Sequence, residues 1–202
     1  MKIECKQVFK RFDREWIVRQ FSHTFEPGRV YGISGPNGSG KSTLLRILAG
    51  HLTPGRGQIL FTHRDQKIPA SKVYTHLTIC GPYIELIEEL KLIEAIEFHF
   101  RFKPLLPEFS LSGLPQVLQL HGHQNRLVST FSSGMRQRLQ LGLALTSASP
   151  FTILDEPTVT LDAKGKQWYQ DLLKQCKDDR LLIIASNEMA DLEQCDELIK
   201  LG

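Results

Sequence analysis

The 202-residue sequence lacks the features of membrane-spanning and secreted chains. Its apolar runs, such as residues 181–185, fall far short of the roughly 20 residues that a helix needs to cross a bilayer. Residues 1–6 show neither the apolar core nor the small-residue cleavage site of a secretory signal. We therefore expect a cytoplasmic protein that cannot span a membrane by itself. At this length we also expect no appended regulatory domain.

Cysteine pairs, charge runs, repeats and long Gly, Ser or Pro linkers are absent as well. The 4 cysteines are dispersed without a CxxC pair, which is typical of reduced thiols. The chain has 25 Lys and Arg against 22 Asp and Glu, a net charge of +3 without a run that could follow a phosphodiester backbone. No nucleic-acid partner is expected. The apolar content of 41% predicts one compact domain with a substantial core.

Apolar runs alternate with helical patterns along the chain. Three runs predict buried strands: residues 29–34, 151–154 and 181–185. Three segments predict helices: residues 42–49, which Gly50 ends, residues 83–102 with an amphipathic pattern, and residues 166–176. The order predicts a parallel α/β sheet interrupted by a helical middle without strand signals.

A phosphate-binding loop lies between the first predicted strand and helix. Residues 35–42 match G-x-x-x-x-G-K-[ST]: Gly35, Pro36, Asn37, Gly38, Ser39, Gly40, Lys41 and Ser42. In this context a glycine-rich turn without a ligand is a poor alternative, because backbone N–H groups converge on an anion at a helix N-terminus. We expect Lys41 near the β- and γ-phosphates, the Ser42 hydroxyl on Mg²⁺ and Thr43 near the α-phosphate. The predicted ligand is a nucleoside triphosphate with magnesium.

Two adjacent carboxylates, Asp155 and Glu156, follow the second predicted strand. Ligands of open α/β sheets bind at the carboxyl ends of the strands. Asp155 is placed to hold magnesium, and Glu156, on the alternate side, to accept a proton from an attacking water. The alternative for this segment alone is a capping acid before the turn proline Pro157.

Residues 131–138 complete a set of motifs in which the chain resembles the ATP-binding cassette (ABC) ATPases over nearly its whole length. Their usual signature is LSGGQ followed by x-Q-R, which this segment matches in part. Its binding residues would be Ser132, Ser133, Gly134 and Met135. Ser132 is a plausible N-cap, so the helix behind it would offer a second anion site; an ordinary capped helix is the alternative. The resemblance implies that this site closes over ATP bound by another cassette, head to tail.

The family resemblance also implies the fold and further site residues. A P-loop NTPase is expected, with a RecA-like parallel sheet, an N-terminal antiparallel β subdomain and an inserted helical subdomain. A single domain would span residues 1–202, its core 1–74 and 147–202 and its helical signature subdomain 75–146. Residues 159–162 look like the D-loop at the interface between cassettes. Phe12 occupies the place of the aromatic that stacks on adenine; Trp16 is the second candidate, and a core position is the alternative for Phe12.

Two positions depart from the family pattern. The glutamine after the middle strand, which ligates magnesium in these proteins, is replaced by Gly81 and Pro82, and the switch histidine by Asn187. Asparagine can donate a hydrogen bond to a phosphate but cannot carry a proton. We therefore expect Glu156, Lys41 and Asn187 as the catalytic residues of an ATPase that binds ATP and closes but turns over slowly.

The family's usual partner is a membrane-embedded permease, so the leading hypothesis is a transporter subunit, peripheral on the cytoplasmic face of the cell membrane. Apolar residues would supply the docking surface, or pack within the helical subdomain: Tyr83, Ile84, Leu86 and Ile87. A soluble ABC ATPase acting on DNA or the ribosome, and a weakly hydrolysing nucleotide sensor, are the alternatives. His121 and His123 have short metal-like spacing, but a solvated loop is favoured because no Cys or carboxylate lies nearby in sequence.

Overall fold

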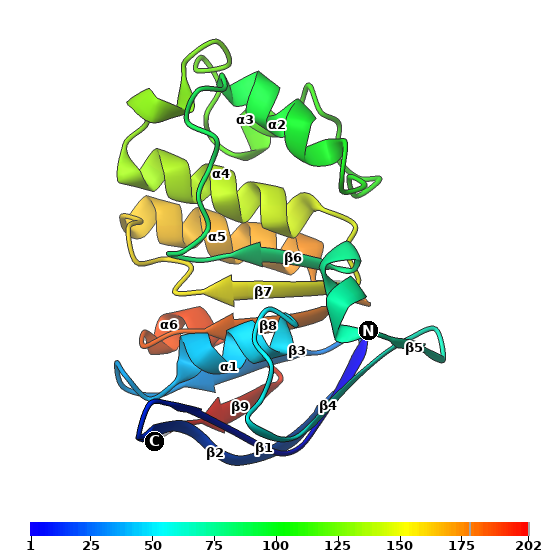
Figure 1. The fold of residues 1–202 in the computed structure, drawn as a ribbon. Coiled ribbons are helices and arrows are strands. Elements are labelled where there is room, and N and C mark those ends of the chain that lie inside the picture. The colour runs from blue at the N-terminus through cyan, green and yellow to red at the C-terminus, as the bar shows by residue number, and fades with distance from the viewer. Residues whose placement is uncertain (178, 202) are drawn as a thin grey trace.

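The computed structural model describes residues 1–177 and 179–201, which form two β-sheets and a layer of helices (Figure 1). One sheet is antiparallel, in the order β2-β1-β4-β5. Its strands are β1 (Lys2–Phe12), β2 (Glu15–Phe25), β4 (Arg56–His63) and β5 (Gln66–Ile68). The other is parallel, in the order β6-β7-β8-β3-β9. Its strands are β3 (Val30–Ser34), β6 (Leu77–Cys80), β7 (Phe151–Asp155), β8 (Leu181–Ala185) and β9 (Glu197–Lys200).

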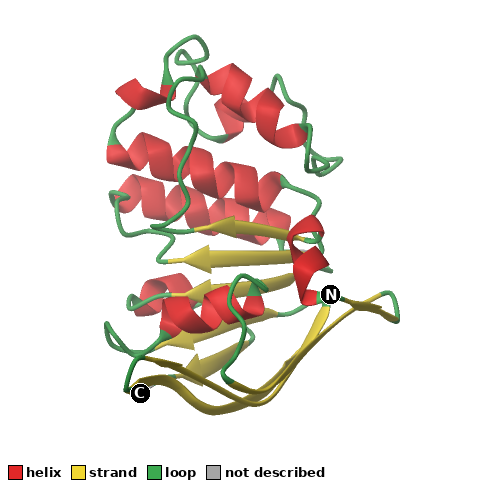
Figure 2. Ribbon diagram, in the orientation of Figure 1, coloured by secondary structure: helices red, strands yellow, loops and turns green. Residues whose placement is uncertain are grey.

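Most helices gather at the end of the molecule away from the antiparallel sheet, whereas α1 and α6 lie beside the parallel strands (Figure 2). They are α1 (Lys41–Leu48), α2 (Leu92–Phe100), α3 (Leu114–Val117), α4 (Ser133–Thr146), α5 (Ala163–Cys176) and α6 (Met189–Leu192), with 3₁₀ turns η1 (Ala70–Thr75) and η2 (Val128–Thr130). Gly50 ends α1 in a left-handed conformation, φ 73°. The architecture confirms the expected fold class.

Each face of the parallel sheet has its own hydrophobic core. Along β8, Leu182 and Ile184 pack with the helices α2 to α5, whereas Leu181, Ile183 and Ala185 pack with α1 and the antiparallel sheet. Successive side chains of a strand point to opposite faces, so a strand with a core on both faces is buried along its whole length. β7 and β8 are buried throughout, and their residues are apolar except Thr152 and Asp155.

The sheet brings the carboxyl ends of its central strands together. Ile33 of β3 pairs with Ala185 of β8, and Ala185 pairs with Asp155 of β7 on its other side. The chain leaves all three strands at one edge, where the Glu156 N–H donates to the Ala185 carbonyl at 2.8 Å and the Ser186 N–H to the Ile33 carbonyl at 3.1 Å. Three chain segments far apart in sequence therefore meet at this edge.

The middle of the chain differs from its sequence prediction in two respects. The strand β6 lies within residues 75–146, the segment predicted as the helical signature subdomain, and it pairs with β7 in the parallel sheet. The helix predicted over residues 83–102 is limited to α2, Leu92–Phe100. Before it, the backbone bonds to other segments: the Gln140 side chain donates to the Ile84 carbonyl, and the Val128 N–H to the Leu90 carbonyl. These bonds replace the helical ones.

Across residues 1–177 and 179–201, every helix is too short or too polar to cross a membrane.

Candidate nucleotide-binding site

The loop between β3 and α1 forms a cradle whose shape depends on Gly40. This residue has φ 95°, and a Cβ there would lie 2.7 Å from the Ile17 carbonyl oxygen. A side chain is excluded both by the conformation and by the contact. The loop therefore turns tightly against β2 and presents the N-terminus of α1, an eight-residue helix, to the edge where the strands end.

Lys41 is the buried cation of this cradle. Its side chain is only 6% exposed, and its ammonium donates to the Gly35 carbonyl at 2.8 Å and to the Asn187 side chain. The Glu156 carboxylate lies 3.6 Å from the same nitrogen. A buried ammonium held among oxygen acceptors is a strong positive point charge in a low dielectric, which suits a phosphate ligand.

Asp155 and Ser42 offer oxygen donors for a divalent cation. The Asp155 carboxylate is 6% exposed, and within the described residues its Oδ1 atom has no hydrogen-bond partner. Burial raises the pKa of this carboxyl, while a hydrogen bond from Ser42 and the charges of Lys41 and Arg46 oppose the shift. Hard oxygen ligands and an unpartnered buried carboxylate oxygen fit Mg²⁺.

Glu156 begins the loop after β7 in the left-handed region, φ 49°, an uncommon conformation for this residue type. Its Oε2 atom lies 3.3 Å from the Asn187 backbone nitrogen and 3.3 Å from the Ser186 hydroxyl. The Asn187 side chain bridges onward, since its amide donates to the Asn37 side chain while its oxygen accepts from Lys41. The three predicted catalytic residues, Glu156, Lys41 and Asn187, are thus in direct contact.

A cavity of about 420 Å³ opens over this cradle. Its lining includes most of the predicted phosphate-binding residues and Phe12, which is 47% exposed: Phe12, Ile17, Asn37, Gly38, Gly40, Lys41, Ser42, Thr43, Pro82, Tyr83 and Glu156. Ile17, Pro82 and Tyr83 were missed as lining residues. Of these three, the sequence pointed only to Pro82, because it stands where the family has a glutamine near the magnesium site.

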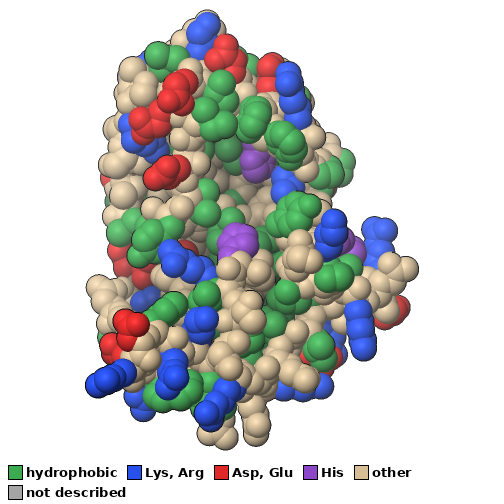
Figure 3. Space-filling model, in the orientation of Figure 1, with side chains coloured by type: hydrophobic (Ala, Val, Ile, Leu, Met, Phe, Trp, Pro, Cys, Tyr) green, Lys and Arg blue, Asp and Glu red, His purple; other side chains and the backbone are tan. Residues whose placement is uncertain are grey.

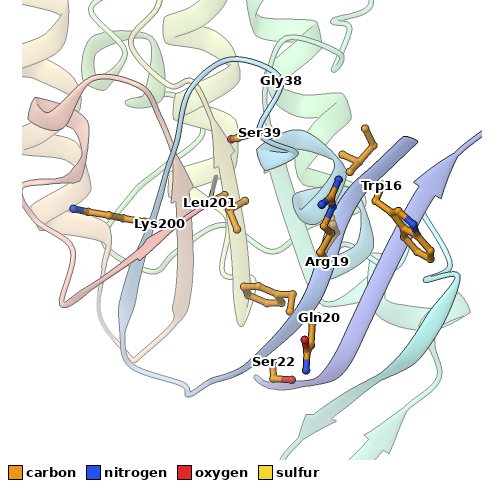
Figure 4. Close-up of a pocket in the computed structure, with 11 residues that line it drawn as sticks. Trp16, Arg19, Gln20, Ser22, Gly38, Ser39, Lys200 and Leu201 are labelled. Carbon is orange, nitrogen blue, oxygen red and sulfur yellow. The ribbon is translucent and has the colours of Figure 1, made fainter. Parts of the chain in front are cut away.

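Trp16 lines a different, larger cavity of about 590 Å³ along β2, which adjoins the first at Ile17 and Gly38 (Figure 4). Gly38, Ser39, Arg19, Lys200 and Leu201 also contribute to its lining. The Trp16 indole points away from the phosphate loop and packs edge-on against Phe9, with ring centroids 5.7 Å apart. Phe12 and Trp16 therefore line separate cavities, and only Phe12 shares one with Lys41.

The signature segment lies apart from the cradle. Ser132 caps α4 by accepting from the Met135 N–H at 3.3 Å, as predicted, and Gly134 and Met135 line a separate cavity of about 420 Å³. Ser133 is exposed at the start of the helix. The lining of this cavity also includes Thr160 and Asp162, from the predicted D-loop, and shares no residue with the cavity over Lys41.

Gly81 packs directly against the acid pair. A Cβ at Gly81 would lie 2.9 Å from the Asp155 Cβ, closer than such atoms approach without displacement. The neighbouring Tyr83 is 69% exposed, and its ring lies 4.6 Å from the Arg46 guanidinium carbon. His121 is exposed at a turn, and His123 lies 3.4 Å from an Arg126 nitrogen.

Comparison with known proteins agrees with this geometry. The sequence profile of the ABC transporter family matches residues 18–159. An uncharacterized ABC transporter ATP-binding protein of Bacillus subtilis, YybJ, is 31% identical over 208 residues, 99% of this chain and 92% of the relative. The sulfate/thiosulfate import ATP-binding protein CysA of Nitrosomonas europaea is 29% identical, over 98% of this chain and 58% of the relative.

Solved structures show the same fold. The ATP-binding subunit of an ABC transporter superposes with a TM-score of 0.86 at 22% identity, over 100% of this chain and 86% of that one. A dimeric bacterial ABC transporter cassette, MJ0796, gives 0.83 at 22% identity, over 98% and 94%. With the profile match and the full-length relative, these likenesses place the chain in the ABC transporter family, among its ATP-binding proteins.

Proposed function

We propose that this protein binds and hydrolyses Mg-ATP and drives solute movement through a separate membrane-embedded permease. One observation carries the proposal: a buried lysine, a buried magnesium-type carboxylate and a second carboxylate converge at a helix N-terminus, over an open cavity. This set of groups suits phosphoryl transfer to water, in which positioning and charge stabilisation do most of the work.

Each residue of the cradle has a distinct role in this proposal. The loop N–H groups and Lys41 hold the phosphates, and Phe12 stacks on the adenine ring. Ser42 and Asp155 would hold magnesium, which supplies positive charge against the phosphate oxygens when bound. Glu156 accepts the proton of the attacking water, and Asn187 fixes Glu156 through its backbone N–H and Lys41 through its side chain.

The active form proposed here is a head-to-tail pair of cassettes. The cavity lined by Ser132, Gly134 and Met135 is separate from the chain's own phosphate loop, so this anion-binding helix end is available to a nucleotide held by a second cassette. Val159, in the D-loop, is 63% exposed and lies in sequence between Glu156, which lines the cavity over Lys41, and Thr160, which lines the signature cavity. An apolar side chain left exposed there fits an interface that forms when two cassettes close.

Slow turnover follows from Gly81 and Asn187 in this proposal. Because Gly81 leaves no room for a side chain beside Asp155, its position has no amide that could reach the magnesium site. Asn187 is already within reach of Lys41 and Glu156, but it has no titratable proton. ATP binding is therefore retained while the chemical step is slow.

The permease is expected to dock in an apolar groove of about 260 Å³ beside α2. Hydrophobic side chains gather over this part of the molecule in Figure 3. Ile87, Phe98 and Phe102 are 44%, 43% and 71% exposed and line the groove, whose rim carries Glu85 and Lys103. Docking of a permease segment here would hold the protein on the cytoplasmic face of the membrane. Of the four residues predicted for the docking surface, Leu86 and Ile87 line the groove, whereas Tyr83 and Ile84 lie outside it.

Single-turnover hydrolysis of ATP by excess enzyme tests the proposed chemistry. Glu156→Gln should lower the rate by at least about 100-fold, because a positioned base contributes about 10²–10⁴, while ATP affinity stays near that of the wild type. Glu15→Gln, an exposed carboxylate at the start of β2, is the matched control. Equal rates for wild type and Glu156→Gln would remove Glu156 from the chemistry.

A further inference from the structure

A second carboxylate is buried behind the candidate base. Asp191, in α6, is 2% exposed and accepts two hydrogen bonds, from the Thr158 hydroxyl at 2.8 Å and the Ser186 hydroxyl at 2.7 Å. Burial raises the pKa of this carboxyl, and the two hydroxyl donors oppose that shift. Burying a carboxylate costs free energy, because the charged group loses its hydration. We therefore looked for a role of Asp191 in the neighbouring site.

Ser186 connects this carboxylate to Glu156. Its oxygen lies 2.7 Å from Asp191 Oδ2 and 3.3 Å from Glu156 Oε2, and it accepts the Glu188 N–H at 3.0 Å. A hydroxyl has a single proton to donate. The shorter, charge-assisted bond directs that proton to Asp191 and away from Glu156.

The direction of this proton matters because Glu156 has one oxygen to spare. Oε1 faces the Lys41 ammonium at 3.6 Å, whereas the contacts of Oε2 within residues 1–177 and 179–201 are the long one of 3.3 Å from the Asn187 N–H and that of Ser186. A hydroxyl proton turned onto Oε2 would occupy the oxygen that remains for the attacking water.

We propose that Asp191 is a positioning residue of the ATPase site, which holds the Ser186 proton and thereby keeps Glu156 Oε2 available to the nucleophile. Through Thr158 it also fixes the loop after β7 to the loop after β8. This inference rests on the proposed role of Glu156 as the base. Asp191 touches neither nucleotide nor water in this role, and acts only through Ser186.

The variant Asp191→Asn tests the proposal without removing the hydrogen bonds that hold α6. Asparagine offers one acceptor where two hydroxyls donate. Thr158 has no second acceptor among the contacts of the described residues, so it keeps the amide oxygen. The amide NH₂ then donates to the Ser186 oxygen, and the Ser186 proton turns to Glu156, so both hydroxyls keep a hydrogen-bond partner and we expect the fold to be retained.

Single-turnover hydrolysis and ATP affinity are measured for four proteins: wild type, Asp191→Asn, Ser186→Ala and the double variant. Asp191→Asn should lower the rate about 10- to 100-fold, as expected for a hydrogen bond to a charged group that must first break, with unchanged ATP affinity. Ser186→Ala should stay within about threefold of the wild type, because no hydroxyl remains to occupy Glu156. In the double variant the alanine should restore the rate lost in Asp191→Asn.

The restoration separates this role from a structural one. Asp171→Asn, an exposed aspartate of α5, is the control and should leave the rate unchanged. A double variant no faster than Asp191→Asn, or a loss of ATP affinity in step with the rate, would show that Asp191 merely supports the fold and would overturn the inference. So would Asp191→Asn hydrolysing as fast as wild type. A wild-type protein that binds ATP without any hydrolysis would instead contradict the proposed function itself, and the role of Asp191 with it.

Discussion

Lys41 and its neighbours decide, at the scale of single residues, what the cradle can hold. The ammonium is buried among the Gly35 carbonyl, Asn187 and Glu156, a mixture of neutral and negative acceptors that a phosphate group could replace or join. Asp155 is as buried as Lys41, and its Oδ1 atom has no hydrogen-bond partner within the described residues. Charge of both signs is thus concentrated where the strands end, and apolar contact comes from Phe12 at the rim of the cavity.

Phe12 should contribute to nucleotide affinity through its ring face. Stacking of a base on an aromatic side chain is worth about 1–3 kcal/mol, so Phe12→Ala should weaken Mg-ATP binding by about tenfold or more, whereas Phe12→Tyr should not. Isothermal titration calorimetry measures both. Trp16→Ala is the control, because Trp16 lines the other cavity, and a larger loss in Trp16→Ala than in Phe12→Ala would assign the adenine contact to Trp16 instead.

The residues of the phosphate loop and the acid pair could be predicted from sequence because each lies in a continuous motif next to its own strand or helix. Ser186 and Asp191 could not. Their role depends on β7 and β8 being neighbours in the sheet, which places residues 156 and 186 side by side although they are 30 positions apart. Short polar residues after a strand carry no such signal by themselves.

At the scale of secondary-structure elements, hydrophobic periodicity predicted some helices correctly and others wrongly. Residues 83–91 have apolar residues at helical spacing, but their backbone carbonyls accept hydrogen bonds from other segments. The Ile84 carbonyl accepts from Gln140 of α4, and the Leu90 carbonyl accepts from Val128, which precedes α4. Tertiary contacts outweigh periodicity there. The α5 helix, by contrast, was predicted over residues 166–176, because its buried residues repeat every three or four positions. It begins three residues earlier, at Ala163, where the N-cap Asp162 accepts from the Gly165 N–H at 2.7 Å.

Two buried hydroxyl groups join β6, β7 and α4 by hydrogen bonds. Thr78 donates to the Ala144 carbonyl at 3.1 Å, and its oxygen lies 3.0 Å from the Thr152 hydroxyl. Thr78→Val should lower the free energy of unfolding by about 1–3 kcal/mol, because the buried Thr152 hydroxyl loses its partner.

Equilibrium urea denaturation of Thr78→Val, Thr152→Val and the double variant measures this tie. Replacing both hydroxyls removes the unsatisfied group, so the double variant should lose less stability than the two single losses combined. Strictly additive losses would mean that the two hydroxyls act independently.

At the scale of the whole molecule, three separate surfaces are available: the cavity over Lys41, the signature cavity and the apolar groove beside α2. The first two share no residue, and in the function proposed above a nucleotide is closed between the cavities of two cassettes. The groove lies in the helical part of the molecule, among residues of α2 and the segment before it. Under that proposal, movement of the helical part on closure would transmit ATP binding to a docked permease.

The groove should be needed for membrane association but not for ATP binding. Ile87→Asp with Phe102→Asp places two charges in the apolar lining, which should abolish recovery of the protein with membranes of its own cells while ATP affinity is unchanged. Leu111→Asp, at an exposed leucine outside the groove, is the control. Undiminished recovery of the double variant with membranes would place the docking surface elsewhere.

The mass of Glu156→Gln in solution with saturating Mg-ATP tests the central claim most directly, because this change is expected to slow hydrolysis and so retain the closed state. Light scattering on a sizing column should give a dimer with Mg-ATP and a monomer without it. Adding Ser132→Arg, which places a bulky side chain at the signature helix end, should return the mass to that of a monomer. A monomer for Glu156→Gln despite measured ATP binding would contradict the account of two cassettes joined by nucleotide.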